Sequence, residues 1–190
     1  MIKFENVSKH YGKNQVLKDL SFEIKDGERV FISGASGVGK TTLIRIIAGL
    51  EHCMGNVFVD KKVALMFQES RLFEHLSALE NVLCVCEKID EKKREIAKGL
   101  LSRLGLADDI NTLAKELSGG MAQRVALARA LMSDRDILIL DEPFSALDPQ
   151  TKATAAEVIL DFCKNNRTLI LISHIEGDKE LLCEREINLR

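Results

Sequence analysis

The sequence lacks the segments that would carry a protein into or across a membrane. Its longest apolar runs, such as Ile137–Leu140 and Leu169–Ile172, are far too short to span a bilayer. The amino-terminal residues 1–6 lack the apolar core of a signal peptide. We therefore expect a cytoplasmic protein.

Cysteines at metal or redox spacing are also lacking. None of the five cysteines belongs to a C-x-x-C pair, and no histidine stands at zinc-ligand spacing. An odd number of scattered cysteines is typical of reduced, mostly buried thiols, and we favour this interpretation over a metal or redox role. The five are Cys53, Cys84, Cys86, Cys163 and Cys183.

Charge of one sign is not in excess, because 27 basic and 29 acidic residues leave a net charge of -2. So small a net charge does not draw the whole protein to nucleic acid or anionic lipid. Repeats and low-complexity segments are absent, and the two prolines, Pro143 and Pro149, lie in one loop. A chain of 190 residues that is 46% hydrophobic predicts one domain with room for an inserted lobe.

Short apolar strands alternate with helices along most of the chain, which predicts a mostly parallel sheet with ligands at the carboxyl ends of its strands. Asp26-Gly27 predicts a hairpin turn. A tight turn at 60–62 predicts that the strands on either side of it pair. Strands are expected at 2–7, 16–24, 29–33, 57–59, 63–67, 137–140 and 168–173, and helices at 40–48, 121–132 and 151–165.

From residue 77 the apolar period becomes helical, so we expect the segment 77–116 to be all-helical and to interrupt this alternation. Ser77 and Glu80 form a capping-box pattern that predicts the start of a helix. A second helix follows, because Ile96, Leu100, Leu101 and Leu104 recur at helical spacing. We therefore expect a helical subdomain at 77–116, inserted into a core formed by 1–76 and 117–190.

A glycine-rich loop stands between a predicted strand and a predicted helix. It fits the P-loop (Walker A) pattern G-x-x-x-x-G-K-T. Its glycines let backbone N–H groups close around phosphate oxygens, and the helix N-terminus favours an anion. We expect Lys40 to reach the terminal phosphates and Thr41 to offer its hydroxyl to Mg²⁺. The loop reads Gly34-Ala35-Ser36-Gly37-Val38-Gly39-Lys40-Thr41-Thr42.

Two acidic residues follow the apolar strand 137–140. By themselves Asp141 and Glu142 are an ordinary turn or helix-start signal. Together with the phosphate loop they indicate a Walker B element. In that case Asp141 holds Mg²⁺, and Glu142 is the general base for the attacking water.

The sequence Ser118-Gly119-Gly120 precedes another predicted helix. Ser118 is a good N-cap, which is its simplest interpretation. The alternative is a second anion site, made of free N–H groups and a hydroxyl at a helix N-terminus. Two glycines would let a phosphate approach closely.

Over nearly its whole length, and in the same order, the chain resembles the nucleotide-binding domain of ABC (ATP-binding cassette) ATPases. The resemblance implies the P-loop NTPase fold of this family, with a mostly parallel α/β core, an antiparallel β subdomain and an inserted α-helical subdomain. The remaining family motifs fall at Tyr11 and Val16 (adenine contact), Gln68 (Q-loop), Leu117–Gly120 (signature), Ser145–Asp148 (D-loop) and His174 (switch histidine).

The resemblance also implies how these residues work. ATP binds Tyr11, Val16 and the phosphate loop of one subunit. The signature residues Ser118, Gly119 and Gly120 of a second subunit cap the γ-phosphate, and Asp148 communicates across the dimer. The implied catalytic residues are Lys40, Glu142 and His174, and the implied Mg²⁺ ligands are Thr41, Gln68 and Asp141.

Some positions depart from the family pattern. Met121 replaces the usual Gln of the signature, as in some importer families. Ile175 stands where an acidic residue commonly follows the switch histidine. Because the chain ends soon after 187–189, we expect it to lack the regulatory carboxy-terminal domain of some importers.

The resemblance implies a transport ATPase. We expect an ATP-dependent homodimer, or pairing with a related cassette, on the inner face of the cell membrane, with an integral membrane permease docked near Gln68–Leu76. The segment 67–81 resembles importers of small anions such as nitrate, sulfonate or taurine, and more weakly molybdate. An exporter subunit is a further option. The alternative is a soluble ABC ATPase acting on nucleic acid, ribosomes or cofactor assembly, although a single cassette without a basic stripe favours no direct nucleic-acid binding.

Overall fold

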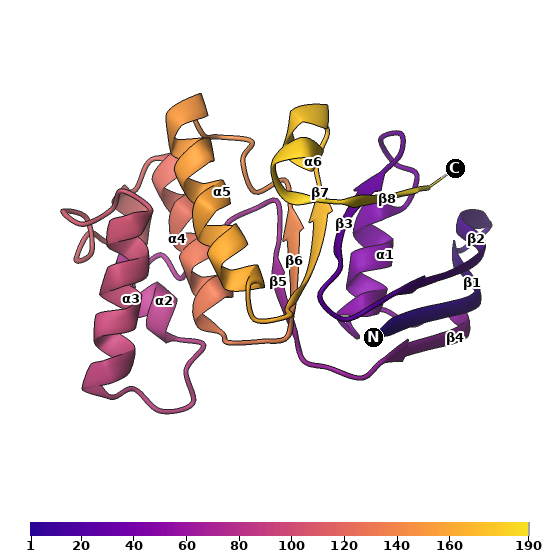
Figure 1. Ribbon diagram of the computed structural model, residues 1–190, viewed down its shortest axis with the longest axis horizontal. Helices are drawn as coiled ribbons and strands as arrows, with labels where there is room; N and C mark the ends of the chain where they lie inside the picture. The colour runs from indigo at the N-terminus through magenta and orange to yellow at the C-terminus, as the bar shows by residue number, and fades with distance from the viewer. Residues whose placement is uncertain (190) are drawn as a thin grey trace. The chain divides into compact units, whose positions relative to one another are not determined.

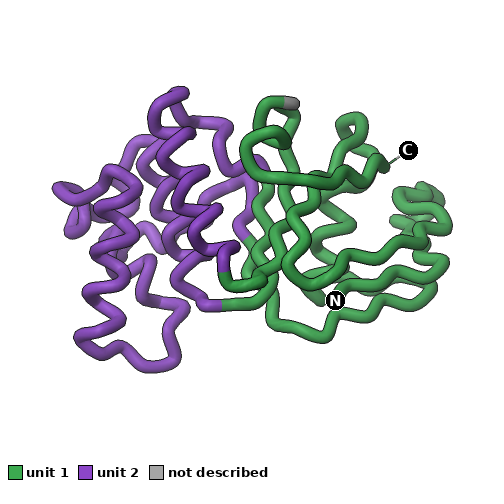
Figure 2. The backbone as a smooth tube through the Cα atoms, in the orientation of Figure 1, with its two compact units in different colours: residues 1–65, 135–141, 165–190 green, residues 66–134, 142–164 purple. Residues whose placement is uncertain are grey.

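The computed structural model describes residues 1–189 and divides into two compact units, drawn in different colours in Figure 2. The first unit consists of residues 1–65, 135–141 and 165 onward. The second consists of residues 66–134 and 142–164. This division follows the packing of the backbone and crosses the expected subdomain boundaries, which stay a prediction.

The first unit contains an antiparallel sheet in the order β2-β1-β4 (Figure 1). Strand β1 (Ile2–Tyr11) pairs with β2 (Asn14–Ile24) on one side and with β4 (Met54–Val59) on the other. Buried residues alternate with exposed ones at the start of β1, because only one face of this sheet is covered. This sheet carries Tyr11 and Val16.

A second sheet has the order β5-β6-β7-β3-β8. Strands β6, β7, β3 and β8 run parallel, so their carboxyl ends meet at one edge, which is where ligands bind in such sheets. Phosphate-loop, acidic and histidine residues all follow these ends. The strands are β5 (Val63–Met66), β6 (Ile137–Asp141), β7 (Thr168–Ile172), β3 (Arg29–Ser33) and β8 (Arg185–Asn188).

Two local pairings expected from the sequence are wrong. Strands β4 and β5 do not pair with each other across 60–62, because β4 joins the antiparallel sheet and β5 adjoins β6. Asp26-Gly27 likewise forms no hairpin, since β2 and β3 belong to different sheets. Each turn instead leads the chain from one sheet to the other.

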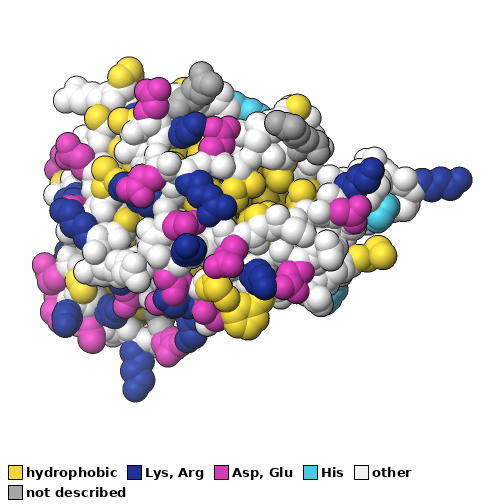
Figure 3. Space-filling model, turned by 45° about the vertical axis from the view of Figure 1, so that its right-hand side comes forward, with side chains coloured by type: hydrophobic (Ala, Val, Ile, Leu, Met, Phe, Trp, Pro, Cys, Tyr) yellow, Lys and Arg dark blue, Asp and Glu magenta, His cyan; other side chains and the backbone are white. Residues whose placement is uncertain are grey.

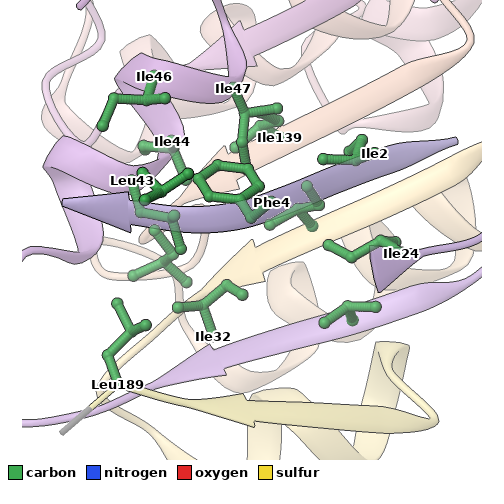
Figure 4. Packing of buried hydrophobic residues seen from close by; sticks show 14 of the residues in the cluster. Ile2, Phe4, Ile24, Ile32, Leu43, Ile44, Ile46, Ile47, Ile139 and Leu189 are labelled. Carbon is green, nitrogen blue, oxygen red and sulfur yellow. The ribbon is translucent and has the colours of Figure 1, made fainter. Parts of the chain in front are cut away.

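The core of the first unit takes apolar side chains from both sheets and from α1 (Lys40–Ile47), as Figure 4 shows. Phe4 lies among Leu43, Ile44 and Ile139, and its ring stacks on Phe22 with the centroids 4.6 Å apart. Gly49 follows α1 with φ 71°, which confirms the expected glycine at the end of this helix. The core therefore holds the helix that follows the phosphate loop against both sheets.

The second unit is helical. It contains α2 (Ala78–Leu83), α3 (Glu91–Arg103), a short 3-10 helix (Ala114–Glu116), α4 (Gly119–Met132) and α5 (Pro149–Cys163). The capping box of Ser77 and Glu80 is confirmed. Helix α3 buries Ala97 and Leu101 but leaves Ile96 42% exposed, so its apolar face is narrower than the sequence suggested.

None of the five cysteines forms a disulfide within residues 1–189. The expectation that they are mostly buried is wrong, because Cys84 is exposed and the other four are half-buried. Among residues 1–189, no helix has both the length and the apolar character needed to cross a membrane.

Candidate functional site

The phosphate-loop sequence joins β3 to α1, the strand–loop–helix arrangement that the motif requires. Helix α1 begins at Lys40 without a side-chain cap and without an acidic residue in its first turn. Ser36 and Gly37 are exposed, so the outer side of the loop is open to a ligand. A helix N-terminus of this kind favours an anion.

Lys40 lies along the inside of this loop. Its Nζ donates hydrogen bonds to the backbone carbonyls of Gly34, at 2.7 Å, and Ala35, at 3.0 Å. The side chain is 7% exposed, so its charge is held among polar backbone groups rather than in bulk water. Lys40 is thereby placed within the loop that a phosphate would enter.

Gly39 shows why the loop requires glycine. Its φ is 106°, a conformation that side-chain-bearing residues rarely adopt. A Cβ at this position would lie 2.6 Å from Cδ2 of Leu17 and 2.9 Å from Cγ1 of Val16. The loop therefore packs directly on β2, and Val16, the predicted adenine contact, lies beside it.

Asp141 ends β6 and is 4% exposed. Burial raises the pKa of its carboxyl group, while the charges of Lys40 and His174 act in the opposite direction. Two other predicted site residues of the first unit, Lys40 and His174, thus act electrostatically on Asp141. An acidic group held in this way is prepared to accept a cation.

His174 follows β7 and borders a cavity of about 260 Å³ in the first unit. Gly34 of the phosphate loop lines the same cavity. The structure therefore brings the predicted switch histidine next to the start of the phosphate loop. The lining residues are Phe31, Ser33, Gly34, Ser173, His174, Lys179, Glu186 and Asn188.

Tyr11 lies at the end of β1 with its side chain 44% exposed. The Nζ of Lys9 lies 5.0 Å from the centroid of its ring, a cation–π contact. An exposed ring at a strand end offers a face for a planar base, which is what the predicted adenine contact needs.

In the second unit, Ser118 is the N-cap of α4, and its Oγ accepts a hydrogen bond from the Met121 N–H at 3.3 Å. Gly119 has no neighbour where a Cβ would stand, whereas a Cβ at Gly120 would lie 2.8 Å from the Ala146 carbonyl oxygen. Ser118 and Gly119 are exposed. The N-cap interpretation is thus correct, and the open helix end leaves the anion-site interpretation as a prediction.

Glu142 and the segment after it are tied to α4 by Gln123. The Nε2 of Gln123 donates to the Glu142 carbonyl at 2.6 Å and to Ser145 Oγ at 3.0 Å. Its Oε1 accepts from the Ala146 N–H at 3.0 Å. These hydrogen bonds hold α4 and the segment 142–146 together. The Glu142 side chain is buried.

Two further predicted residues lie in the second unit. Asp148 is the N-cap of α5 and accepts hydrogen bonds from the backbone N–H groups of Gln150 and Thr151, both at 3.0 Å. A hydrogen bond from the Thr151 hydroxyl is the main reason that the pKa of Asp148 is lowered. Gln68 is exposed just after β5. Their predicted roles in signalling and Mg²⁺ binding stay predictions.

A Mg²⁺ ion fits the donor groups of the first unit. Within residues 1–189, no group of three or more His, Cys, Asp or Glu side chains forms a metal cage. Mg²⁺ is usually held by one or two carboxylates together with substrate phosphates, not by such a cage. The carboxylate of Asp141 and the exposed hydroxyl of Thr41, in the first turn of α1, match that pattern.

Sequence reasoning missed the polar side chains that hold these motifs in place. Gln123, Asn81 and Asp178 are 3%, 0% and 1% exposed, and none belongs to a motif. The available signal was a polar residue within an otherwise apolar helix face. That signal does not reveal which loop such a residue contacts.

Comparison with known proteins gives consistent matches. The family model described as ABC transporter matches residues 17–145. The Glutamine transport ATP-binding protein GlnQ of Escherichia coli K12 is 38% identical over 98% of this chain and 86% of its own length. The Aliphatic sulfonates import ATP-binding protein SsuB 2 of Pseudomonas syringae is 40% identical over 99% of this chain and 69% of its own.

Solved structures agree with the fold. The dimeric post-hydrolysis structure of the ATP-binding cassette MJ0796 bound to ADP and Pi superposes with a TM-score of 0.91. It is 30% identical in sequence, and the match covers 100% of this chain and 94% of that one. The likeness includes both the sheets and the helices described above.

Proposed function

Because this chain belongs to the ABC transporter family, we propose that it is the ATP-binding and ATP-hydrolysing subunit of an importer. The observation that carries this proposal is the phosphate loop. Lys40 is hydrogen-bonded inside this loop and its charge acts on Asp141, while His174 borders the cavity that Gly34 of the loop lines. The proposal assigns ATP as substrate and places Tyr11 and Val16 at its adenine end.

Each proposed site residue has a separate role in ATP hydrolysis. Lys40 and the N-terminus of α1 neutralise phosphate charge, and this charge stabilisation is the main term in phosphoryl transfer. Glu142 accepts a proton from the attacking water, and His174 contacts the γ-phosphate. Bound Mg²⁺, held by Thr41 and Asp141, would neutralise charge on the β- and γ-phosphate oxygens.

The active unit is proposed to be a dimer. Ser118, Gly119 and Gly120 form an open helix end that would close on the triphosphate held by the phosphate loop of another copy. The dimeric MJ0796 cassette with ADP and Pi supports this arrangement. The partner is a second copy of this chain or a related cassette.

The output of hydrolysis is proposed to be solute import. The relatives are named for glutamine transport and for glutamate/aspartate and aliphatic sulfonate import. A small polar solute, such as an amino acid or a small organic anion, is therefore proposed. A permease in the cytoplasmic membrane would dock near Gln68–Leu76, with this chain peripheral on the inner face. Charges of both signs intermingle on the face drawn in Figure 3, which does not favour nucleic acid as a partner.

The first experiment compares the wild type with Lys40→Ala and Glu142→Gln. The wild type is expected to hydrolyse ATP only with Mg²⁺. Glu142→Gln should keep ATP affinity but lose about 10²- to 10⁴-fold in hydrolysis rate, because only the base is lost. Lys40→Ala should weaken ATP binding itself, because charge-assisted phosphate contacts are lost. A wild type without Mg²⁺-dependent hydrolysis contradicts the proposal.

The second experiment is affinity capture of the tagged chain from its native cells. Recovery of an integral membrane protein supports the importer. Recovery of RNA or DNA without a membrane protein contradicts it and favours a soluble ATPase.

A further inference from the structure

The backbone on either side of His174 is closed by a ring of hydrogen bonds within the first unit. The Ser173 hydroxyl donates to Oδ2 of Asp178 at 2.5 Å and accepts from the Ile175 N–H at 3.0 Å. The Asp178 N–H donates to the Ile175 carbonyl at 3.0 Å. The residues on either side of His174 are thereby joined to Asp178, Ser173 through its hydroxyl and Ile175 through its carbonyl.

The carboxylate of this ring is buried. Asp178 is 1% exposed and Ser173 is 5% exposed, whereas His174 between them is exposed. A distance of 2.5 Å is in the range of a charge-assisted O–H···O⁻ hydrogen bond, which is stronger than a neutral one. A buried carboxylate is costly without such partners, so the hydrogen bond from Ser173 stabilises Asp178 at this place.

The hydrogen-bonded ring takes the place of a side-chain cap at the start of α6 (Glu176–Leu182). Ile175 is the N-cap of α6 and has no side chain that could cap it. The start of α6 is instead held by Ser173 and Asp178, and an ion pair between Lys179 and Glu186 ties the helix to β8. The direction in which His174 leaves β7 is therefore set by α6.

We propose that Asp178 is the positioning residue of His174 and acts through Ser173 to hold the imidazole at the cavity that Gly34 also lines. This inference rests on the proposed function, because His174 is needed there at the γ-phosphate. Asp178 itself touches no substrate. Its role is to keep the histidine in one place while ATP is bound and hydrolysed.

A double-mutant cycle tests this proposal. Asp178→Ala is expected to lower kcat for ATP hydrolysis about tenfold and to change KM for ATP less than about twofold, because misplacement affects the reacting geometry more than binding. On a His174→Ala background the same change should have no further effect on kcat. Ser173→Ala should behave like Asp178→Ala, and Ser173→Thr, which keeps the hydroxyl, should restore the rate.

The matched control is Thr168→Val at the other end of β7. Thr168 is 3% exposed, and its Oγ1 accepts a hydrogen bond from the Gly27 N–H at 3.1 Å. Its substitution removes a buried hydroxyl of the same unit far along the strand from His174. Thr168→Val is expected to lower the free energy of unfolding without changing kcat at a temperature where the variant is folded.

A second readout does not depend on activity. The chain has four histidines, so the His174 ring can be assigned by NMR in histidine-labelled protein through loss of its signal in His174→Ala. Asp178→Ala should shift or broaden that signal, and Thr168→Val should leave it unchanged. Folding of each variant is checked in the same spectra.

The outcomes separate the two proposals. Equal loss of kcat from Asp178→Ala with and without His174, or an unchanged His174 signal, overturns the positioning role. A wild type that does not hydrolyse ATP overturns the proposed function, and the His174 signal then still decides whether Asp178 orients the ring.

Discussion

At the scale of single residues, the burial of Asp141 makes the free energy of unfolding depend on pH. The pKa of Asp141 is raised above its ordinary value of 3.8 because its carboxylate is buried. A raised pKa means that this group favours folding most below 3.8 and loses that contribution as the pH rises through its pKa in the folded protein. Above that pH a buried charge must be maintained.

Asp141→Asn is therefore expected to stabilise the nucleotide-free protein at neutral pH while abolishing Mg²⁺-dependent hydrolysis. The gain in the free energy of unfolding should shrink as the pH is lowered toward about 4, because the wild-type carboxyl group then becomes neutral. Urea unfolding at several pH values measures this difference. A gain that is the same at every pH would show that burial of the charge is not its cause.

Neighbouring glycines at the start of α4 are expected to respond in opposite ways to the same substitution. Gly120→Ala should cost about 1–3 kcal/mol of stability, because its Cβ would lie 2.8 Å from the Ala146 carbonyl oxygen. Gly119→Ala meets nothing within 4 Å and should leave stability unchanged or raise it by up to about 1 kcal/mol. Urea unfolding of both variants measures the difference.

Gly119→Ala should nevertheless slow ATP hydrolysis, because its methyl group would stand on the open surface proposed to meet the triphosphate. Each variant thus controls for the other. Full activity of Gly119→Ala would contradict a phosphate contact at this helix end.

The residues proposed to carry chemistry follow from the sequence, because phosphate binding requires particular residues at fixed spacing. The residues proposed to position them do not follow from it. Asp178 and Gln123 reach their partners through contacts that depend on how the chain folds, and no spacing rule reveals such contacts.

At the scale of elements, Asn81 of α2 holds the segment that leads from Gln68 into the helices. Its Oδ1 accepts from the Phe73 N–H at 2.8 Å. Its Nδ2 lies 3.1, 3.2 and 3.0 Å from the carbonyl oxygens of Phe73, Leu76 and Ser77. One buried amide thus fixes the shape of the segment where a permease is proposed to dock.

Asn81→Ala should lower the free energy of unfolding by about 2–4 kcal/mol, because several buried backbone groups lose their partner. The control is Ser133→Ala, which removes one hydroxyl contact with the Ala130 carbonyl in the same unit and should cost less than about 1 kcal/mol. Urea unfolding of both variants, and hydrogen exchange of residues 73–77, provide the measurements. Equal stability losses would show that the hydrogen bonds of Asn81 stabilise the unit no more than the single hydroxyl contact of Ser133 does.

Some element boundaries followed from local patterns, but strand partners did not. Strands β1 and β4 are longer than the predicted 2–7 and 57–59, and α6 was not predicted. The capping box of α2 is confirmed because capping is a contact within one turn of helix. The partner of β4 is β1, where Val57 lies opposite Phe4. The pairing of β4 with β1 buries an apolar face against α1. The short turn at 60–62 therefore wrongly predicted that β4 pairs with β5.

At the scale of the whole molecule, ATP is expected to change the oligomeric state. Glu142→Gln with Mg²⁺ and ATP should form a species of roughly twice the monomer mass, because ATP is bound but not hydrolysed. Size-exclusion chromatography with light scattering measures this mass. Mg²⁺ with ADP should leave the protein monomeric.

The control for dimerisation is Ser118→Asp on the Glu142→Gln background. Aspartate is as good an N-cap as serine, so α4 stays capped. Its negative charge would oppose a triphosphate at that helix end. A dimer that forms equally well with and without the Ser118→Asp substitution would contradict the sandwich arrangement.

The fold class was predictable because an ordered set of motifs spans most of the chain, and the structural neighbours confirm it. The compact units were less predictable. Helices α4 and α5 belong to the second unit, although α4 comes just before β6 in the sequence and α5 lies between β6 and β7. Such grouping reflects packing between distant parts of the chain, which sequence patterns do not record.

The backbone at Glu142 has a consequence for how this chain would respond to selection in the laboratory. Its φ is 53°, a conformation that glycine and asparagine adopt more readily than glutamate, at a difference of roughly 1 kcal/mol. A library enriched only for heat resistance should therefore drift away from glutamate at position 142. A library enriched for turnover should restore it.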